Sequence, residues 1–286
     1  MKKYFFITLA AVLFLFSIAI YQYVQFHDGR LHVIFCDVGQ GDAILVKSPA
    51  NKLILIDGGS DKSVLACLSR HMPFWEKRLD LMLLTHPHAD HHNGLYYVLE
   101  QYAVGSFATE DLRNSTAGFR TLLDKLAEQK VSQQVVFADD AWQLPDGVTI
   151  TIVGPTQEFL HSTDPDGTIT DSAESGSLIT EVVYGELVIL LTGDAPVDEL
   201  AEVVPRNEPV DILQSPHHGS KTGMSSDVLE RLQPQLIAIS VGLENKYGHP
   251  SASVLALYKA FSLPVLRTDQ RGDIEIVSNG REWWVK

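Results

Sequence analysis

Cysteine is scarce in this chain of 286 residues. Only Cys36 and Cys67 are present, and they lack the close pairing that is typical of zinc fingers and redox motifs. They fall in an expected strand and an expected helix, so we expect two buried thiols, with a disulfide as the alternative. The sequence therefore offers no cysteine-based metal or redox motif.

Positive charge is also scarce. The chain has 22 Lys and Arg against 36 Asp and Glu, which gives a net charge of −14. This balance argues against broad electrostatic binding of nucleic acid, because such binding depends on neutralising phosphates. Bound divalent cations would change the balance locally, since they add positive charge at the point where a phosphate would lie.

Low-complexity segments and short repeats are absent, and 45 % of the residues are hydrophobic, as in a globular protein. An N-terminal apolar segment precedes about 255 further residues, which is near the upper limit for one domain. We therefore expect a single globular domain over residues 31–286.

Charge is missing from the N-terminal segment after Lys2 and Lys3, where an apolar run extends over residues 4–26. This run is long enough to cross a membrane, and the two lysines should stay on the cytoplasmic side. We expect residues 1–26 to be a single-pass anchor in the cell membrane, with the rest of the chain outside. The alternative is a signal peptide cleaved after residues 17–19, which would give a secreted protein. No cysteine directly follows the run, which argues against a lipoprotein.

From Leu31 onward, short apolar strands alternate with helices. The expected strands are 31–36, 43–47, 52–56, 79–85, 135–138, 148–153, 177–184, 187–192, 210–214, 236–240, 265–268 and 274–278. The expected helices are 63–71, 93–102, 117–129, 196–203, 226–232 and 252–261. A polar loop over residues 154–176 is too long for an ordinary connection, so we expect it to border a site. The alternation, in two halves that meet near residue 150, predicts two packed sheets with helices outside.

The densest chemical feature is the run THPHADH over residues 85–91, between an apolar strand and a helix. Four of the 11 histidines lie between positions 86 and 92, which makes a chance surface cluster a poor explanation. Neutral imidazoles and a carboxylate are the natural ligands of Zn²⁺. In a tight turn, His86 and His88 can point to one metal, while Asp90 and His91 point to a second.

Two later apolar strands also end in polar motifs. Asp194 closes the motif LTGD, where its carboxylate could bridge two cations, although an aspartate in such a place is also common in turns. Residues 215–220 form the motif SPHHGS. Because adjacent side chains on a strand point opposite ways, only one of His217 and His218 should be a direct ligand. Gly219 would let the backbone approach the ligand closely.

Together these motifs resemble those of the metallo-β-lactamase superfamily. The run THPHADH matches its HxHxDH signature, Asp194 matches its bridging aspartate, and the pair 217–218 matches its last histidine. Within the superfamily, the chain is similar to the hydrolase domain of ComEC-type DNA-uptake competence proteins. The motifs that carry this likeness, in family order, are DVGQGD (37–42), IDGG (56–59), THPHADH (85–91), LTGD (191–194), HHGS (217–220) and YGHP (247–250). The resemblance implies an α/β (α+β) fold, the αββα sandwich, preceded here by the N-terminal transmembrane helix.

The resemblance also implies metal-assisted hydrolysis with one or two Zn²⁺ ions, with Mn²⁺ as the other candidate. The metals would lower the pKa of a bridging water to near neutrality and so produce a hydroxide nucleophile. The predicted ligands are Asp90, His91 and His217 for one metal, His86 and His88 for the other, and Asp194 between them.

The sequence departs from the superfamily pattern at one place. A further histidine usually completes the first metal site, just before the strand that leads to the bridging aspartate. Here that place is the stretch 171–177, which has no histidine, and ComEC-type domains also tend to have a small polar residue there. His161 could complete the site from the preceding loop, or water could do so.

Other polar residues are expected around the metals. Asp42 and Asp57 could orient a metal-bound histidine, with a buried turn aspartate as the alternative for both. His249, before Pro250 at the start of a helix, could hold a substrate phosphate or protonate the leaving group, or it could be structural. The candidate catalytic residues are therefore Asp90, His218 and His249, and the candidate substrate contacts are Ser220 and Lys221.

The bond that we expect the protein to cleave is a phosphodiester, because the competence domain that the chain resembles is thought to be a nuclease acting on incoming DNA. With one apolar run instead of many, the chain is not expected to conduct DNA itself. The acidic composition favours a smaller substrate, as in phosphodiesterases of wall polymers, phosphorylcholine esterases, lactonases or β-lactamases. A non-catalytic, metal-bound partner in an envelope complex is the alternative of another class.

Overall fold

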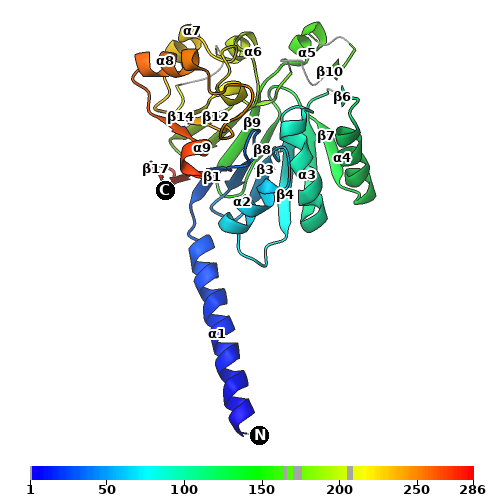
Figure 1. Ribbon diagram of the computed structural model, residues 1–286, viewed down its shortest axis with the longest axis vertical. Helices are drawn as coiled ribbons and strands as arrows, with labels where there is room; N and C mark the ends of the chain where they lie inside the picture. The colour runs from blue at the N-terminus through cyan, green and yellow to red at the C-terminus, as the bar shows by residue number, and fades with distance from the viewer. Residues whose placement is uncertain (1, 112, 164–165, 170–175, 205–208) are drawn as a thin grey trace.

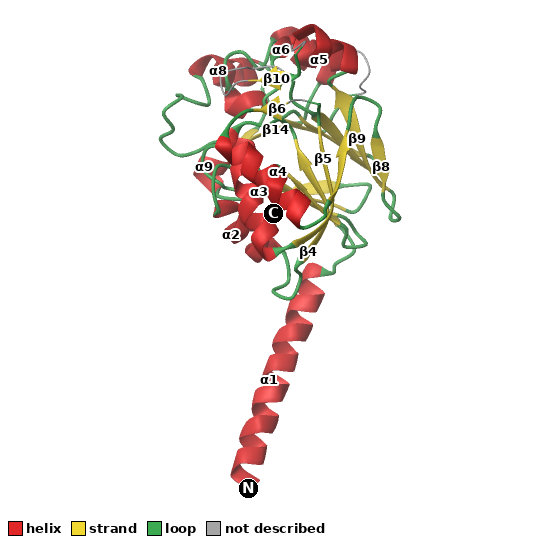
Figure 2. Cartoon of the chain, turned by 90° about the vertical axis from the view of Figure 1, so that its right-hand side faces the viewer, coloured by secondary structure: helices red, strands yellow, loops and turns green. Residues whose placement is uncertain are grey.

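Two β-sheets packed face to face form the body of the protein, and a long N-terminal helix projects from it (Figures 1 and 2). The computed structural model describes residues 2–111, 113–163, 166–169, 176–204 and 209–286. Helix α1 (Lys2–Phe26) leaves the body at the start of the first strand and makes up the projection. Helices cover the outer face of each sheet, so the αββα sandwich expected from the sequence is confirmed.

The first sheet has eight strands in the order β17-β16-β1-β2-β3-β4-β5-β7. Its strands are β1 (Leu31–Phe35), β2 (Ile44–Lys47), β3 (Leu53–Ile56), β4 (Arg78–Leu84), β5 (Ala103–Thr109), β7 (Ser132–Val135), β16 (Ile274–Ser278) and β17 (Trp283–Val285). The strands from β17 to β3 pair antiparallel, whereas those from β3 to β7 pair parallel. Parallel neighbours need crossover connections. These contain α2 (Ser63–His71), α3 (Ala89–Gln101) and α4 (Ala117–Glu128).

The second sheet has seven strands in the order β15-β14-β13-β12-β11-β9-β8. Its strands are β8 (Ala141–Gln143), β9 (Val148–Gly154), β11 (Ile179–Tyr184), β12 (Leu187–Leu191), β13 (Ile212–Gln214), β14 (Leu236–Ile239) and β15 (Val265–Arg267). Its helices are α6 (Val197–Val203), α7 (Ser226–Leu232) and α8 (Ala252–Ala260). Smaller elements are β6 (Arg113–Asn114), α5 (Gln157–Thr163), β10 (Thr168–Ile169), η2 (Pro216–Gly219) and α9 (Thr268–Arg271).

Three layers of buried side chains hold the sandwich together. One lies between the two sheets and contains Phe35 from the first and Ile150 from the second. A second layer joins the first sheet to α2, α3 and α4, and a third joins the second sheet to α6, α7 and α8. Strands β1, β2 and β3 are buried at every position, because a strand in the middle layer is covered on both faces.

Most expected elements lie within one or two residues of their observed bounds, with a few differences. Helix α3 begins at Ala89 instead of residue 93, so Asp90 and His91 belong to its first turn. Strands β5, β6, β8, β10 and β17 were not predicted, and the strand expected at 135–138 lies at Ser132–Val135. The expected loop 154–176 contains α5 and β10, and its residues 170–175 lie outside the described part.

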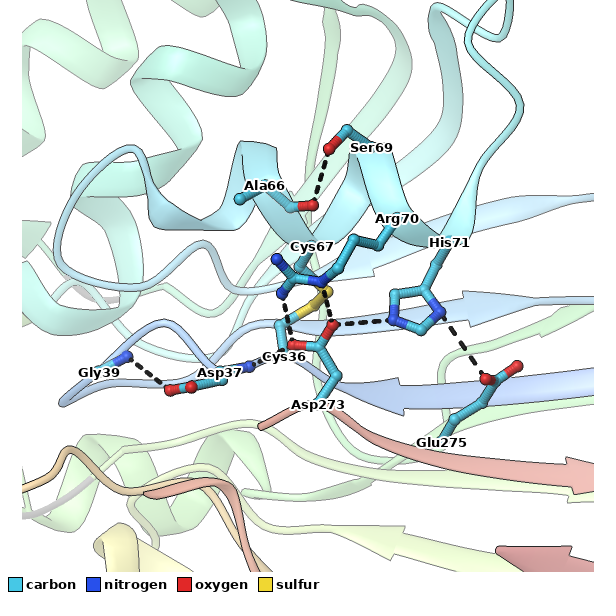
Figure 3. The surroundings of a disulfide bond; sticks show 10 residues. All are labelled: Cys36, Asp37, Gly39, Ala66, Cys67, Ser69, Arg70, His71, Asp273 and Glu275. Atoms are coloured by element: carbon cyan, nitrogen blue, oxygen red, sulfur yellow. Dashed lines mark hydrogen bonds and ion pairs between the residues drawn. A yellow bond between two sulfur atoms is a disulfide. The ribbon is translucent and has the colours of Figure 1, made fainter. Parts of the chain in front are cut away.

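The two cysteines form a disulfide, so the expectation of free thiols was wrong. Cys36 directly follows β1 and Cys67 lies on α2, where the helix packs against the sheet, and both are almost fully buried. Their Cα atoms are 5.7 Å apart, within the range that a disulfide requires, although the residues are 31 positions apart in sequence (Figure 3). The sequence placed the strand and the helix correctly but contained no signal for their contact.

Reduction of this disulfide is expected to lower the free energy of unfolding by about 3 to 4 kcal/mol, because the bond restricts the unfolded chain across its loop. Urea unfolding with and without reductant measures the change. A Cys36→Ala/Cys67→Ala double variant serves as the control, since its midpoint should not respond to reductant. Equal midpoints for the oxidised and reduced wild type would contradict the prediction.

Asp273 connects the disulfide region to the C-terminal part of the first sheet (Figure 3). Its carboxylate accepts two hydrogen bonds from Arg70 and one from His71, all at 2.8 Å, and one from the backbone N–H of Asp37. Burial alone would raise the pKa of Asp273, but the hydrogen bonds from His71 and Arg70 outweigh it and hold the pKa well below its ordinary value. The carboxylate thereby fixes the start of the segment 37–42.

Asp273→Asn is expected to lower the free energy of unfolding at pH 7 by about 2 to 3 kcal/mol, since it weakens several charge-assisted hydrogen bonds. Because the folded pKa of Asp273 is depressed, its stabilisation is present above the ordinary pKa and is lost as the pH falls through the folded value. The difference between wild type and variant should therefore shrink in urea titrations stepped from pH 7 down to pH 3. Asp227→Asn, which disrupts an exposed pair with Arg231, should change stability little at any pH.

Candidate metal centre

The run THPHADH leads from the end of β4 into the first turn of α3 and brings His86 and His91 close to Asp194. His91 is fully buried, and its Nδ1 lies 2.7 Å from Asp57 Oδ2. Asp57 also accepts hydrogen bonds from the backbone N–H and the hydroxyl of Thr85, at 2.8 and 2.7 Å. These bonds fix the ring of His91 with Nε2 turned toward Asp194.

Asp194 is the centre of the site. Its Oδ1 lies 3.3 Å from His91 Nε2 and 3.5 Å from His218 Nε2. Its Oδ2 lies 3.6 Å from His217 Nε2 and 3.8 Å from His86 Nε2. Each carboxylate oxygen thus lies within 4 Å of two imidazole nitrogens. A carboxylate with donors beside both oxygens could bridge two cations.

The donor atoms form two overlapping groups among the described residues. Atoms within 4.8 Å of one another come from Asp42, His91, Asp194 and His218 in one group, and from His86, His88 and Asp194 in the other. Asp90 borders the first group, because its Oδ2 lies 3.6 Å from His218 Nε2. Both groups combine imidazole with carboxylate, which suits Zn²⁺ or Mn²⁺.

Several of these buried atoms have no hydrogen-bond partner within the described part of the chain. They are the Nε2 atoms of His86, His91 and His218, Oδ1 of Asp194 and Oδ1 of Asp42. A buried polar atom without a partner costs about 1 to 3 kcal/mol, so five that converge on one place need an explanation. Divalent cations would satisfy them together, and the residues present therefore fit a metal centre.

The protonation of the metal-free cluster is set by charge pairing. Burial opposes the charge of Asp194, but His218 and His91 outweigh it and hold the pKa of that carboxyl well below its usual value. Burial likewise opposes the imidazolium of His218, yet Asp194 and Asp42 raise its pKa to about 9. A raised pKa favours the protonated ring of His218 in the metal-free cluster, whereas burial and the neighbouring His91 lower the pKa of His86. A metal bound at His218 would then displace a proton.

His217 and His218 lie in the short turn η2, so the expectation that they lie on a strand, with side chains pointing opposite ways, was wrong. Both residues have left-handed backbone angles, with φ of 50° and 55°. His217 N donates to Gly193 O at 3.0 Å, and His218 Nδ1 lies 3.0 Å from Ser240 O. A Cβ at Gly219 would come within 2.5 Å of Pro250 Cβ, so this glycine permits close packing of the turn against Pro250.

The grouping of the two histidines differs from the prediction. We expected His217 beside Asp90 and His91, but His218 lies there. His217 faces the Asp194 oxygen that His86 also faces. The side chain of His218 is 1 % exposed and that of His217 is 22 % exposed, so His217 lies at the solvent side of the centre.

Asp42 reaches further into the site than the sequence indicated. Its Oδ2 accepts a hydrogen bond from Gln214 Nε2 at 2.8 Å, and its Oδ1 lies 3.8 Å from His218 Nδ1. Burial raises the pKa of Asp42, while His218 and His91 oppose that rise. The carboxyl therefore belongs to the buried cluster itself.

Gln214 and Ser177 are site residues that sequence reasoning missed. Gln214 Oε1 accepts from the backbone N–H of Thr192 and Gly193 at 2.9 and 3.3 Å, so it ties the loop of the bridging aspartate to Asp42. Ser177 Oγ accepts from Asp194 N at 3.1 Å and lies 3.4 Å from His86 Nδ1. A polar residue at the end of an apolar strand was the available signal for Gln214.

Glu199, also missed, anchors the segment that carries Ser177. Its two carboxyl oxygens accept from the backbone N–H of Gly176 and Ser177, both at 3.1 Å. Burial raises its pKa to about 8 despite these hydrogen bonds. Ser177 belongs to the stretch where the further histidine of the superfamily was expected, and residues 171–175 of that stretch lie outside the described part.

The remaining predicted residues lie around the centre. The ring centroids of His249 and His217 are 5.6 Å apart. The backbone N–H of His249 donates a hydrogen bond to Asn245 Oδ1, and the backbone O of His249 accepts one from Asn245 Nδ2. Ser220 is buried with its Oγ 3.0 Å from Thr222 Oγ1, whereas Lys221 is exposed. His161 lies exposed on α5 and belongs to none of the donor groups found among the described residues.

The chain belongs to the metallo-β-lactamase superfamily, whose family model matches residues 36–236. It is 30 % identical to ComE operon protein 3 of Bacillus subtilis and 28 % identical to competence protein ComA of Neisseria gonorrhoeae. These matches cover 87 % and 93 % of this chain but 33 % and 35 % of the relatives, so the chain spans about a third of their length. Zn²⁺-bound PqqB of Methylobacterium extorquens has the same fold, with a TM-score of 0.54 at 17 % identity over 82 % of this chain and 97 % of that one.

Proposed function

We propose that the protein is a phosphodiesterase with two divalent cations, acting on the outer side of the cytoplasmic membrane. The observation that supports this most is the position of Asp194, each of whose oxygens faces a separate pair of imidazole nitrogens. A pair of cations on either side of one carboxylate suits the in-line displacement at phosphorus, because it can stabilise both the attacking and the leaving oxygen.

The proposed ligands follow from the contacts around Asp194. Asp90, His91 and His218 would hold the buried cation, and His86, His88 and His217 would hold the cation nearer to solvent. His217 would then supply the nitrogen that the stretch 171–177 lacks. When bound, Zn²⁺ or Mn²⁺ would supply a Lewis acid and an acidified water.

The chain's own residues prepare this centre before a substrate arrives. Asp57 holds the ring of His91, the backbone oxygen of Ser240 holds that of His218, and Gln214 fixes the loop before Asp194. Such fixed dipoles cost no reorganisation during the reaction. His249, at the edge of the centre beside His217, is proposed to hold a substrate phosphate or to protonate the leaving oxygen. Ser220 and Lys221 are proposed substrate contacts, and of these Lys221 is solvent-exposed.

Single-stranded DNA is the substrate class that we propose. The relatives named above are competence proteins, and the chain matches one part of them over most of its own length. The net charge of −14 opposes a duplex, whereas a single strand has a lower charge density and can reach the cations locally. The same charge favours small phosphodiesters as the second candidate.

Placement outside the membrane rests on two features. Residues Lys3–Phe26 form a helix that is long and apolar enough to span a bilayer, and Lys2 and Lys3 would stay on the cytoplasmic side. The Cys36–Cys67 disulfide favours an oxidising compartment for the body of the protein. We therefore propose a single-pass membrane protein whose catalytic body lies outside the cytoplasm.

The test is hydrolysis by the full chain in detergent, loaded with Zn²⁺ or Mn²⁺, of bis-p-nitrophenyl phosphate beside single-stranded and duplex DNA. Cleavage of the ester and the single strand, abolished by chelation, would support the proposal. Cleavage of the ester alone would replace DNA with a small or wall-polymer phosphodiester. Bound metal without turnover of any substrate would overturn the phosphodiesterase and favour a non-catalytic partner.

A further inference from the structure

An exposed pair of aromatic residues lies in the loop 72–77, between α2 and β4. Phe74 and Trp75 are 63 % and 40 % exposed, and their ring centroids are 5.0 Å apart. Tyr97 and Tyr247 are also exposed, but each of these carries a polar hydroxyl, whereas phenylalanines such as Phe35 and Phe107 are buried in the core. A pair of large apolar side chains left in solvent needs a partner, and its position suggests one.

The pair lies against the end of α1. Trp75 lines an apolar hollow together with Ala19, Ile20 and Tyr23, and the backbone N–H of Phe74 donates to Gln22 Oε1 at 3.2 Å. A second hydrogen bond joins the body to the end of α1, because Lys47 Nζ on β2 donates to Phe26 O at 3.0 Å. The loop is therefore held at a defined height along the helix.

That height coincides with the outer edge of a bilayer that α1 would cross. At 1.5 Å per residue, Ala19 lies about 24 Å and Tyr23 about 30 Å along the helix from Lys3. The hydrocarbon core of a bilayer is about 30 Å thick. Trp75, level with these residues, would thus reach the boundary between acyl chains and headgroups, where tryptophan and tyrosine are enriched in membrane proteins.

Strand β4 connects the loop to the metal centre. β4 begins at Arg78, directly after the loop, and ends at Leu84, directly before the run THPHADH. Six steps along a strand cover about 20 Å. The aromatic pair and the metal centre therefore lie at opposite ends of one buried strand.

We propose that Phe74 and Trp75 insert into the outer interface of the bilayer that α1 spans, as a second membrane contact beside the helix. The proposal rests on the membrane anchoring proposed above. With two contacts the body cannot swivel freely about the end of α1, and the metal centre faces away from the lipid at a fixed height.

Tryptophan quenching by brominated lipids tests this contact in the full chain, reconstituted into nanodiscs. The chain has four tryptophans and none lies within α1, so quenching reports on the body. The wild type is compared with Trp75→Phe and, as the matched control, with Trp142→Phe on β8. We expect acyl-chain bromine to quench the wild type and Trp142→Phe alike, and to lose at least half of its effect in Trp75→Phe.

Equal quenching in all three proteins, or none, would overturn the inserted loop while leaving the anchor intact. Extraction of the chain from membranes by alkaline carbonate would instead overturn the anchor, and the loop with it. A crosslink from position 75 to a second copy, without lipid quenching, would assign the aromatic pair to self-association.

Discussion

Asp194→Asn is expected to abolish cation binding at both halves of the centre and to reduce hydrolysis by on the order of a thousandfold or more. The substitution keeps the size of the side chain but removes the charge that four imidazole nitrogens surround. An amide offers one oxygen and one N–H₂ group, so it can face a cation on one side only. Bound metal is measured by elemental analysis after gel filtration, and hydrolysis with bis-p-nitrophenyl phosphate.

Asp198→Asn is the matched control, because it makes the same change at an exposed position on α6, four residues further along the chain. It should keep the wild-type metal content and rate. If Asp194→Asn retained two bound metals per chain, the bridging role of this carboxylate would be wrong.

His218→Ala is expected to remove the buried cation and to lower hydrolysis by roughly 100-fold or more, since His218 is fully enclosed between Asp90 and Asp194. His217→Ala should leave the buried cation in place. It should weaken the other cation by roughly tenfold or more, because His86, His88 and Asp194 remain. Isothermal titration of each metal-free variant with Zn²⁺ measures the number of ions bound and their affinities. His218→Ala should lose one ion, whereas His217→Ala should bind one of its two ions more weakly.

His161→Ala is the control for this pair, since its exposed ring on α5 should contribute nothing. Loss of a cation in this variant would assign the missing ligand to His161. Equal effects of His217→Ala and His218→Ala would contradict the separation of the two histidines between the two halves.

The fold was accessible from the sequence because most of its strands are continuous apolar runs that end at recognisable turns. Strand β3 and helix α2 illustrate this, as their hydrophobic pattern alone fixes their bounds to within a residue. Strand β8 was not predicted, because it is a short edge strand whose residues are mostly exposed and therefore show no apolar pattern.

Only part of the candidate site could be predicted from the sequence. The run THPHADH indicated metal chemistry from composition, since its ligands are adjacent in the chain. The positions of the His217 and His218 rings depend instead on left-handed backbone angles at both residues, whereas alternation along a strand predicts that only one of them faces the site. Gln214 and Cys67 act through contacts with residues far away in sequence, at Asp42 and Cys36, and a single sequence contains no signal for such pairs.

The shared carboxylate of Asp194 has a thermodynamic consequence. One side chain faces both groups of imidazoles, so a cation held by one group would change the orientation and charge that the carboxylate presents to the other. If two cations bind as proposed, linkage requires the effect to be reciprocal, and each ion would change the affinity of the other by the same factor. The two binding constants would then be properties of the pair, and a substitution at His86 would be expected to change the affinity measured on the side of His91 as well.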